Sequence, residues 1–184
     1  MDRVPEDVLV VFDEAYAEIC LGEMPDTLSF VHKGRACMVL RTFSKAYGLA
    51  GLRIGYGVGP EAIIKELEKP RQPFNANLAA QKAAVAALDD DQFLDDSVQT
   101  YNEARAFCEA LCDELKLDYV RAYANFMLIK TGNGLDVTSA LTSEGVIVRP
   151  MAPYGLAEWI RVSFGRADEN EAFAKALKKV LVNV

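Results

Sequence analysis

The sequence predicts an α/β fold, because short apolar runs alternate with segments of helical periodicity. Three apolar runs, each followed by polar or glycine-rich sequence, occupy residues 8–12, 36–42 and 52–58. Continuous runs of this kind are typical of strands that are covered on both faces. A second observation is one long helical pattern, in which apolar residues recur every three or four positions from residue 94 to residue 115. We therefore expect a strand-containing first part, a long helix and a smaller second part.

Two helices are expected between the third strand and the long helix. Pro60 follows the third apolar run, and proline suits the first turn of a helix. The apolar stripe of this helix consists of Ile63, Ile64 and Leu67. The next helix is rich in alanine and is expected at residues 76–88.

A cluster of aspartates at residues 89–96 precedes the long helical pattern. Acidic side chains are favoured at a helix N-terminus by the helix macrodipole, so we expect the long helix to begin there. We place a domain boundary at this cluster, with a first domain at residues 1–88 and a small α+β domain at residues 89–184. Within the second domain, strands are expected at residues 126–130, 146–149 and 159–164, and helices at residues 135–143 and 170–182.

The charge and hydropathy of the chain exclude several classes of function. The 184 residues carry a net charge of -7, and the pI is about 4.8. An acidic protein repels phosphate backbones and anionic lipids, so nucleic acids and membrane surfaces are poor candidate partners. No stretch approaches 18 uninterrupted apolar residues, and no basic segment followed by a long apolar stretch opens the chain. We therefore expect a cytoplasmic protein.

His32 is the single histidine, which excludes a metal centre built on several histidines. We expect no metal site and assign no role to His32. The cysteines form no CxxC pair, and we expect reduced thiols in a cytoplasmic protein. The two that lie four residues apart should share a buried helix face. The four cysteines are Cys20, Cys37, Cys108 and Cys112.

A lysine at the end of an expected strand is the main candidate for chemistry. Lys45 follows the second apolar run, and α/β sheets present ligand-binding residues at such strand ends. Such a lysine could extend into water, or its amine, when partly desolvated, could form a Schiff base. Thr42 and Arg53 are close in sequence, so a hydroxyl and a guanidinium can converge near the amine. The neighbouring glycines match neither a dinucleotide fingerprint nor a P-loop, so these cations must bind another kind of anion.

Asp13 ends the first apolar run and is the second candidate. It could cap a turn, but a carboxylate at a strand end is costly to bury unless a cation pairs with it. Asp13 and Lys45 are separated by about one strand–crossover–strand unit, so both can lie at the same edge of adjacent parallel strands. A carboxylate for a pyridinium nitrogen, an amine for an aldehyde, and an arginine with a hydroxyl for a phosphate are together what pyridoxal 5'-phosphate (PLP) needs.

Two motifs carry a resemblance to a known family. FDEAY at residues 12–16 and RTFSKAYGLAGLRIGYG at residues 41–57 resemble the fold type I, PLP-dependent aminotransferases, and most closely the histidinol-phosphate aminotransferase branch. The resemblance continues through NANLAAQKAAVAAL, ANFMLIK, GVIVRPM and WIRVSFG, and so covers essentially the whole chain. It implies part of an aspartate aminotransferase-like large PLP-binding domain in residues 1–88, followed by the small C-terminal domain.

The resemblance also implies roles for individual side chains. Lys45 would form the Schiff base with PLP and later move a proton between the substrate and the cofactor. Asp13 would pair with the pyridine nitrogen, and Tyr16 would hydrogen-bond the 3'-oxygen of the ring, although Tyr16 could also be a packed aromatic residue. The side chains that would hold part of the cofactor phosphate are Thr42, Ser44 and Arg53.

Two arginines of the second domain are candidates for binding the substrate. Apolar and polar residues alternate along the expected strand at residues 159–164, so Arg161 faces away from its apolar side. The resemblance implies that Arg161 binds the anionic end of the substrate, with Arg149 as a second candidate. Otherwise both would be surface arginines of a strand.

The family's longer members have further cofactor-binding segments before the Asp13 strand, so we expect this chain to be the C-terminal half of an aminotransferase, weak or inactive alone. The implied reaction transfers an amino group between histidinol phosphate and 2-oxoglutarate in histidine biosynthesis. Decarboxylation of an amino-acid phosphate and transamination of aromatic amino acids are alternatives on the same scaffold. An alternative of another class is a non-catalytic truncated paralogue that acts as an interaction module. The resemblance also implies a homodimer.

Overall fold

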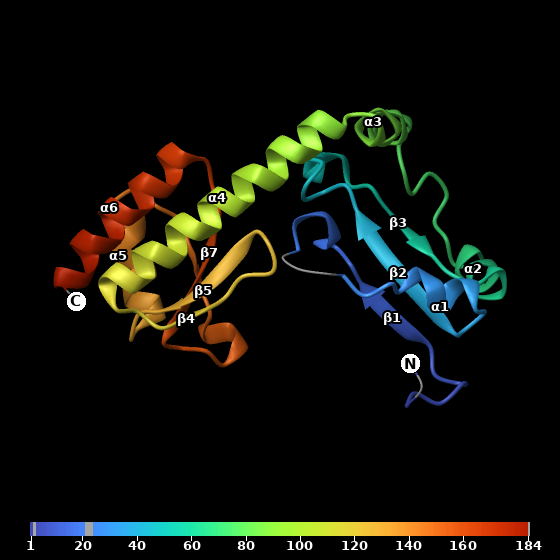
Figure 1. Ribbon diagram of the computed structural model, residues 1–184, viewed down its shortest axis with the longest axis horizontal. Helices are drawn as coiled ribbons and strands as arrows, with labels where there is room; N and C mark the ends of the chain where they lie inside the picture. The colour runs from blue at the N-terminus through green and yellow to red at the C-terminus, as the bar shows by residue number, and fades with distance from the viewer. Residues whose placement is uncertain (2, 21–23, 184) are drawn as a thin grey trace. The chain divides into compact units, whose positions relative to one another are not determined.

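The computed structural model describes residues 1, 3–20 and 24–183. The chain forms two compact units, Met1–Asp95 and Asp96–Val184. In the first unit, three strands lie side by side in the order in which the sequence presents them (Figure 1). They are β1 (Val10–Asp13), β2 (Cys37–Thr42) and β3 (Gly55–Val58), and each begins up to three residues later than its apolar run predicts.

The central strand β2 pairs differently with its two neighbours. β1 runs parallel to β2, with Asp13 opposite Leu40, whereas β3 runs antiparallel to β2, with Gly55 opposite Thr42. Residue 55 must be glycine, because a Cβ there would lie 2.7 Å from the carbonyl oxygen of Arg41. The close approach of β3 to β2 therefore depends on this glycine.

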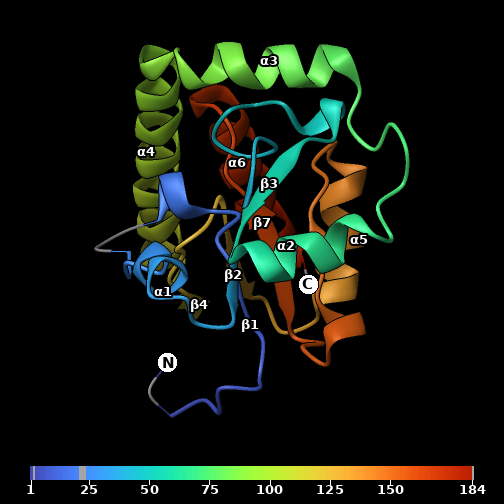
Figure 2. The same cartoon turned by 90° about the vertical axis from the view of Figure 1, so that its right-hand side faces the viewer.

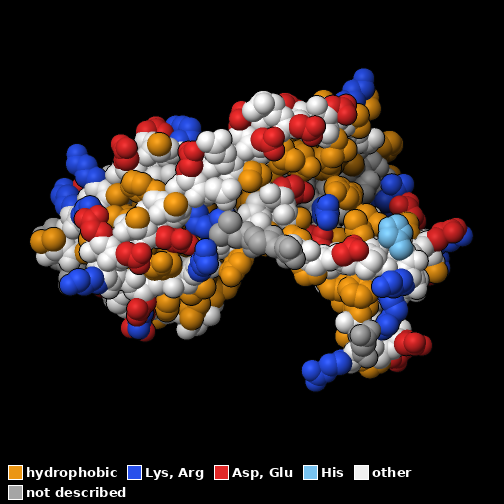
Figure 3. Space-filling model, in the orientation of Figure 1, with side chains coloured by type: hydrophobic (Ala, Val, Ile, Leu, Met, Phe, Trp, Pro, Cys, Tyr) orange, Lys and Arg blue, Asp and Glu red, His pale blue; other side chains and the backbone are white. Residues whose placement is uncertain are grey.

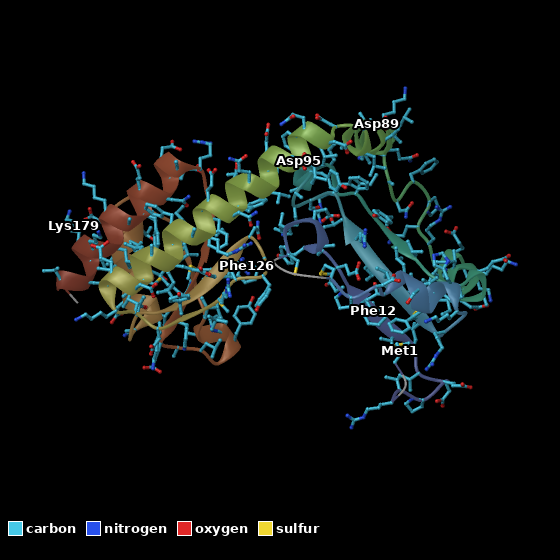
Figure 4. All side chains as sticks on the ribbon, in the orientation of Figure 1. Met1, Phe12, Asp89, Asp95, Phe126 and Lys179 are labelled. Carbon is cyan, nitrogen blue, oxygen red and sulfur yellow. The ribbon has the colours of Figure 1, made fainter. Side chains whose placement is uncertain are left out.

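Coverage on both faces, which the continuous apolar runs predict, is only partly present in this sheet. On one face Val39 is fully buried, and Phe12 stacks on Phe30 of α1 (Leu28–His32) with ring centroids 6.1 Å apart (Figure 4). The other face buries Met38 but leaves its neighbours Val11 and Leu40 51 % and 37 % exposed. The reason is that a strand is buried on both faces only where structure packs on each of them.

The helices of the first unit follow the predicted order. Helix α2 (Glu61–Glu68) begins directly after Pro60, and Ile64 lies near Gly59 and lines a pocket with Met38 of β2; α2 crosses in front of the strands in Figure 2. Helix α3 (Leu78–Leu88) begins two residues later than predicted, because the Asn77 side chain caps it by accepting a 2.8 Å hydrogen bond from the backbone N–H of Ala80. Two short 3₁₀ helices complete this unit, η1 (Ala17–Ile19) and η2 (Ala50–Leu52).

The long helix predicted after the aspartate cluster is α4 (Asp91–Leu115), which has 25 residues and begins in the first unit. The side chain of Asp90 accepts a 3.1 Å hydrogen bond from the backbone N–H of Phe93, so the cluster caps the helix. Cys108 and Cys112 are fully buried on one face, as their spacing predicts, and they are free thiols, as is Cys37. Among the helices of the described residues, none is long and apolar enough to cross a membrane.

The second unit contains a four-stranded antiparallel sheet in the order β4-β5-β7-β6. Alternate residues of the two central strands are buried, and they share one apolar core with α4, α5 and α6, so all three helices lie on the same face of the sheet (Figure 1). The strands are β4 (Tyr119–Val120), β5 (Phe126–Lys130), β6 (Arg149–Pro150) and β7 (Trp159–Ser163), and the helices are α5 (Gly134–Ser143), η3 (Ala152–Tyr154) and α6 (Ala167–Asn183).

The predicted strand at residues 146–149 is wrong in its extent, because β6 begins only at Arg149. The backbone N–H of Val146 donates to the carbonyl oxygen of Leu141 and so terminates α5, next to Gly145 with its positive φ of 82°. Helix α6 begins three residues earlier than predicted. The Glu169 carboxylate accepts a 2.8 Å hydrogen bond from the backbone N–H of Arg166 and thereby caps the additional turn.

Candidate functional site

The candidate residues of the first unit lie at the ends of β1 and β2. Asp13 is the last residue of β1, and Lys45 follows three residues after the end of β2. Because β1 and β2 are adjacent and parallel, these ends lie at the same edge of the sheet, which confirms the predicted arrangement of the two strands. An acidic and a basic side chain are thus brought to one edge.

Tyr16 lies directly beside the lysine. The Lys45 Nζ atom is 5.2 Å from the centroid of the Tyr16 ring, within the range of a cation–π contact. A turn places Tyr16 there: the Asp13 carboxylate accepts a 3.1 Å hydrogen bond from the backbone N–H of Ala15, and the backbone N–H of Ala17 donates to the carbonyl oxygen of Glu14. The FDEAY motif therefore folds into a turn that begins at Asp13 and holds the Tyr16 ring near the Lys45 amine.

The segment that carries Lys45 is held by its own side chains. The Thr42 hydroxyl accepts a 3.1 Å hydrogen bond from the backbone N–H of Ser44, and its oxygen lies 3.4 Å from the carbonyl oxygen of Ile54, to which it donates. Phe43 is buried, and its ring packs on that of Tyr47 with centroids 5.1 Å apart. The hydrogen bonds of Thr42 and the buried ring of Phe43 therefore anchor the segment that leads from β2 to Lys45.

Arg53 lies between η2 and β3 and adopts a left-handed backbone conformation, with φ and ψ both 55°. A non-glycine residue rarely adopts this conformation, and such residues are frequent at ligand sites. One of its guanidinium N–H groups donates a 2.8 Å hydrogen bond to the carbonyl oxygen of Ala50. A guanidinium has five N–H donors, so the exposed Arg53 side chain retains donors for an anion.

A buried network next to these residues was missed by sequence reasoning. The Glu14 carboxylate is only 5 % exposed and accepts hydrogen bonds from Arg41, through Nε at 3.0 Å and Nη2 at 2.9 Å, and from the Thr27 hydroxyl. Tyr56 on β3 is the register partner of Arg41. Burial lowers the pKa of Arg41, but the interactions with Glu14 and Tyr56 outweigh this and raise the pKa overall. Alternation along β1 could have revealed the network, because it places Glu14 on the buried face with Phe12.

The two candidate arginines of the second unit line one pocket of about 590 Å³. Arg149 and Arg161 are directly opposite each other in the β6–β7 pair. The guanidinium carbon of Arg161 lies 4.8 Å from the ring centroid of Phe126 on β5 (Figure 4). Ile160 and Val162 are buried on the other face, which confirms the predicted orientation of Arg161. Within the described residues, the buried Nε atom of Arg161 has no hydrogen-bond partner, so this pocket offers an unused donor to an anion.

The donor set of the first unit fits PLP in its chemistry. An amine, a carboxylate and a phenol lie at one sheet edge, and hydroxyls with a guanidinium follow on the adjoining segments. These groups are complementary to an aldehyde, a pyridinium nitrogen, a ring oxygen and a phosphate. In the described part of the chain, no group of three or more His, Cys, Asp or Glu residues could hold a metal ion.

Comparison with known proteins identifies relatives along almost the whole chain. The family described as Aminotransferase class I and II matches residues 1–177. The Histidinol-phosphate aminotransferase of Akkermansia muciniphila is 49% identical over 98% of this chain and 50% of its own length. The Histidinol-phosphate aminotransferase 2 of Carboxydothermus hydrogenoformans is 45% identical over 98% of this chain and 51% of its own length. The chain thus spans about half the length of the curated relatives it matches.

Solved structures show the same fold. The histidinol-phosphate aminotransferase from Sinorhizobium meliloti in complex with pyridoxal-5'-phosphate is 30% identical, with a TM-score of 0.85 over 98% of this chain and 50% of that one. The L-threonine-O-3-phosphate decarboxylase from Porphyromonas gingivalis is 24% identical, with a TM-score of 0.83 over 96% of this chain and 56% of that one. At this identity the second likeness shows the fold alone.

Proposed function

This chain belongs to the class I and II aminotransferases, and we propose that it serves a PLP-dependent transfer of an amino group between histidinol phosphate and 2-oxoglutarate. The observation that carries the chemistry is the Lys45 amine beside the Tyr16 ring, at the sheet edge that Asp13 shares. The choice of substrate rests on the relatives at 49% and 45% identity, both named histidinol-phosphate aminotransferases. Residues 1–88 are proposed to belong to the large PLP-binding domain, and residues 89–184 to be the small domain.

The first unit is proposed to bind and orient PLP, which when bound supplies an electron sink for the substrate Cα. The Lys45 amine binds the aldehyde and moves the proton that leaves the substrate Cα. The Asp13 carboxylate keeps the pyridine nitrogen protonated, and the Tyr16 hydroxyl donates to the ring oxygen. The side chains that bind the phosphate are Thr42, Ser44 and Arg53.

The second unit is proposed to bind the anionic groups of the substrates. Arg161 binds the phosphate of the amino donor or a carboxylate of the 2-oxo acid, because its buried Nε atom has no partner within the described residues. Arg149 lies opposite Arg161 and binds a second negative group. An amino donor that carries a phosphate and an acceptor with two carboxylates both suit two guanidinium groups in one pocket.

Affinity for PLP is expected to be weak in this chain. Three side chains of the described residues are proposed for the phosphate, and one of them, Arg53, already donates to Ala50. The curated relatives are about twice as long. We therefore propose that full activity needs segments equivalent to the remainder of those relatives.

The experiment that tests the proposal is a titration of the 184-residue chain with PLP, followed by absorbance, borohydride reduction and peptide mapping. We expect a new absorbance band, and after reduction a cofactor adduct at Lys45 that Lys45→Ala abolishes. The matched control is Lys65→Ala, since Lys65 is an exposed lysine of α2 in a surface ion pair with Glu61. Absence of any adduct in the wild-type chain would favour the non-catalytic interaction module.

Product analysis separates the possible reactions. With histidinol phosphate and 2-oxoglutarate as substrates, we expect glutamate as a product. Carbon dioxide released from an amino-acid phosphate without amino transfer would indicate the decarboxylase instead. Amino transfer from tyrosine or phenylalanine, with none from histidinol phosphate, would indicate an aromatic aminotransferase.

We further propose a cytoplasmic homodimer. Exposed apolar side chains that could support self-association occur before and along α3, where Phe74, Leu78 and Val85 are each more than 60 % exposed. Light scattering at several protein concentrations tests the oligomeric state. A monomer at all concentrations would contradict the dimer.

A further inference from the structure

The Glu14 network, which consists of Glu14, Thr27, Arg41 and Tyr56, lies one residue away from two of the proposed cofactor-binding residues. Glu14 directly follows Asp13, the last residue of β1, and Arg41 precedes Thr42 on β2. Successive side chains of a strand point to opposite faces, so the ion pair lies on the buried face while Asp13 and Thr42 point the other way. The ion pair therefore joins the two strand ends from behind the candidate site.

The contacts of Glu14 fix the peptide units around Asp13. Its backbone N–H donates a 2.9 Å hydrogen bond to the carbonyl oxygen of Leu40, and its carboxylate receives two N–H groups of Arg41. The Thr27 hydroxyl donates to the other carboxylate oxygen. Asp13 itself is exposed, and its carboxylate accepts from the N–H of Ala15 in the turn that begins the FDEAY loop. The conformation of this exposed turn thus depends on its buried neighbour.

Arg41 transmits the same restraint to the segment that carries Lys45. It lies directly opposite Tyr56 on β3, and the Tyr56 ring packs on Phe43 with centroids 5.8 Å apart. Phe43 in turn precedes Ser44, whose N–H is held by the Thr42 hydroxyl. One ion pair therefore connects the end of β1, the end of β2, β3 and the start of α1.

Stability alone does not explain a partly buried ion pair at this place. A carboxylate that is removed from water loses its hydration, and a well-packed apolar pair of similar volume is often as stable or more stable. What an ion pair in which two N–H groups of Arg41 converge on one oxygen of Glu14 provides beyond an apolar contact is a defined geometry. In this protein that geometry is imposed on residues directly adjacent to Asp13 and Thr42.

We propose that Glu14 and Arg41 are positioning residues, whose ion pair holds Asp13 and the segment 42–45 in the arrangement that binds PLP. The inference rests on the proposed function, because it assigns the binding of PLP to these two strand ends. Neither residue needs to touch the cofactor. The effect is on the placement of Asp13, Thr42 and Lys45.

The first test measures amide hydrogen exchange of the 184-residue chain without PLP. In Glu14→Gln, which retains the shape of the side chain but removes its charge, we expect the amides of Ala15 and Ser44 to exchange about tenfold faster or more. The amide of Met127, in the core of the second unit, should be unchanged and serves as the internal reference. The matched control is Glu66→Gln, since Glu66 forms an exposed ion pair with Lys69 on α2 and should leave all three amides unchanged.

The second test measures the affinity of the same variants for PLP by absorbance. We expect Glu14→Gln to weaken binding about tenfold, which is the lower end of what loss of a supporting partner costs at metal sites. The proposal is supported if Glu14→Gln both speeds amide exchange at Ala15 and Ser44 and weakens PLP binding. Unchanged exchange at both amides, or faster exchange with unchanged affinity, overturns it.

A pair of variants at Thr27 covers the case in which Glu14→Gln unfolds the first unit. Thr27→Ser retains the hydroxyl that donates to Glu14, whereas Thr27→Val removes it at nearly the same volume. If the ion pair positions the site, Thr27→Ser should have the amide exchange rates and PLP affinity of the wild type. Thr27→Val should show faster exchange and weaker PLP binding. Equal values for the two variants overturn the proposal. If the wild-type chain forms no PLP adduct, the proposed function fails for this chain, and the exchange rates alone decide whether the ion pair holds the two strand ends.

Discussion

The two units of this protein each combine a β-sheet with helices, but they bury their apolar residues to different degrees. In the second unit, one cluster fills the space between the sheet and three helices, and its largest members are at most 1 % exposed: Met127, Ile129, Leu141, Ile160 and Leu177. In the first unit, apolar side chains remain open to solvent on the sheet and on α3, including Val11, Leu40, Leu78 and Val85; hydrophobic atoms gather on this unit in Figure 3. The second unit thus has a complete core, whereas the first unit positions the candidate site residues on a sheet that is only partly covered.

The largest expected difference is whether each unit folds by itself. Residues 91–184, which retain α4 whole, should unfold cooperatively in urea, because their core is contained within them. Residues 1–90 should bind a hydrophobic dye and unfold over a broad range, because much of their apolar surface is exposed. Circular dichroism and dye fluorescence measure both. Cooperative unfolding of residues 1–90 would contradict the conclusion that only the second unit has a complete core.

The same substitution in a helix of each unit sharpens the comparison. Leu177→Ala in α6 should lower the free energy of unfolding by about 4 kcal/mol, because Leu177 is fully buried and its removal leaves a cavity. Leu78→Ala in α3 should change it by less than about 0.5 kcal/mol, because Leu78 is 67 % exposed. Urea unfolding of the 184-residue chain gives both values. Equal effects would mean that the first unit buries Leu78 against something in solution.

Alkaline pH should weaken the second unit through its buried thiols. Burial, with a smaller contribution from Glu109, raises the pKa of Cys108 from 9.0 to about 11, and burial raises that of Cys112 to about 12. A thiol whose pKa is raised by folding stabilises the fold below pH 9, and this stability is lost as the pH rises from about 9 toward the folded pKa. A rise from 9.0 to about 11 corresponds to about 3 kcal/mol for Cys108.

The measurement is urea unfolding of residues 91–184 between pH 8 and pH 11. The control is the double variant Cys108→Ala and Cys112→Ala, in which this part of the pH dependence should disappear. An identical slope in the control would show that other groups cause the alkaline loss.

The smallest expected effects come from helix caps and should be similar in the two units. Asn77 caps α3 in the first unit and Asn133 caps α5 in the second, where its side chain accepts from the N–H groups of Leu135 and Asp136. Either change to alanine should cost about 1 kcal/mol, and either change to aspartate much less. Calorimetry of the four variants tests this. A much larger cost for Asn133→Ala would mean that the units also differ in their local hydrogen bonds.

Features encoded by local pattern could be predicted. The spacing of Asp13 and Lys45 indicated adjacent parallel strands, and the alternation around Arg161 indicated which face it occupies. The aspartate cluster indicated the start of α4. These features depend on the periodicity of a strand or helix and on capping within a few residues, so the chain itself carries the information.

Features that depend on contacts between distant residues could not be predicted in the same way. Sequence reasoning passed over Glu14 and Arg41, which pair across 27 residues, and it had no means of placing the Lys45 amine over the Tyr16 ring. It also expected a strand to begin at Val146, but the backbone N–H of Val146 donates to the carbonyl oxygen of Leu141 at the end of α5. The exposure of Val11 and Leu40 likewise depends on what packs above them.

The amino-acid order was therefore sufficient to predict most of the elements and the sheet edge that Asp13 and Lys45 share. The folded chain was needed to show that Glu14 and Arg41 pair next to that edge and which unit has a complete core. The physical reason is that periodicity and capping act over a few residues, whereas burial and ion pairing depend on groups that only the fold brings together.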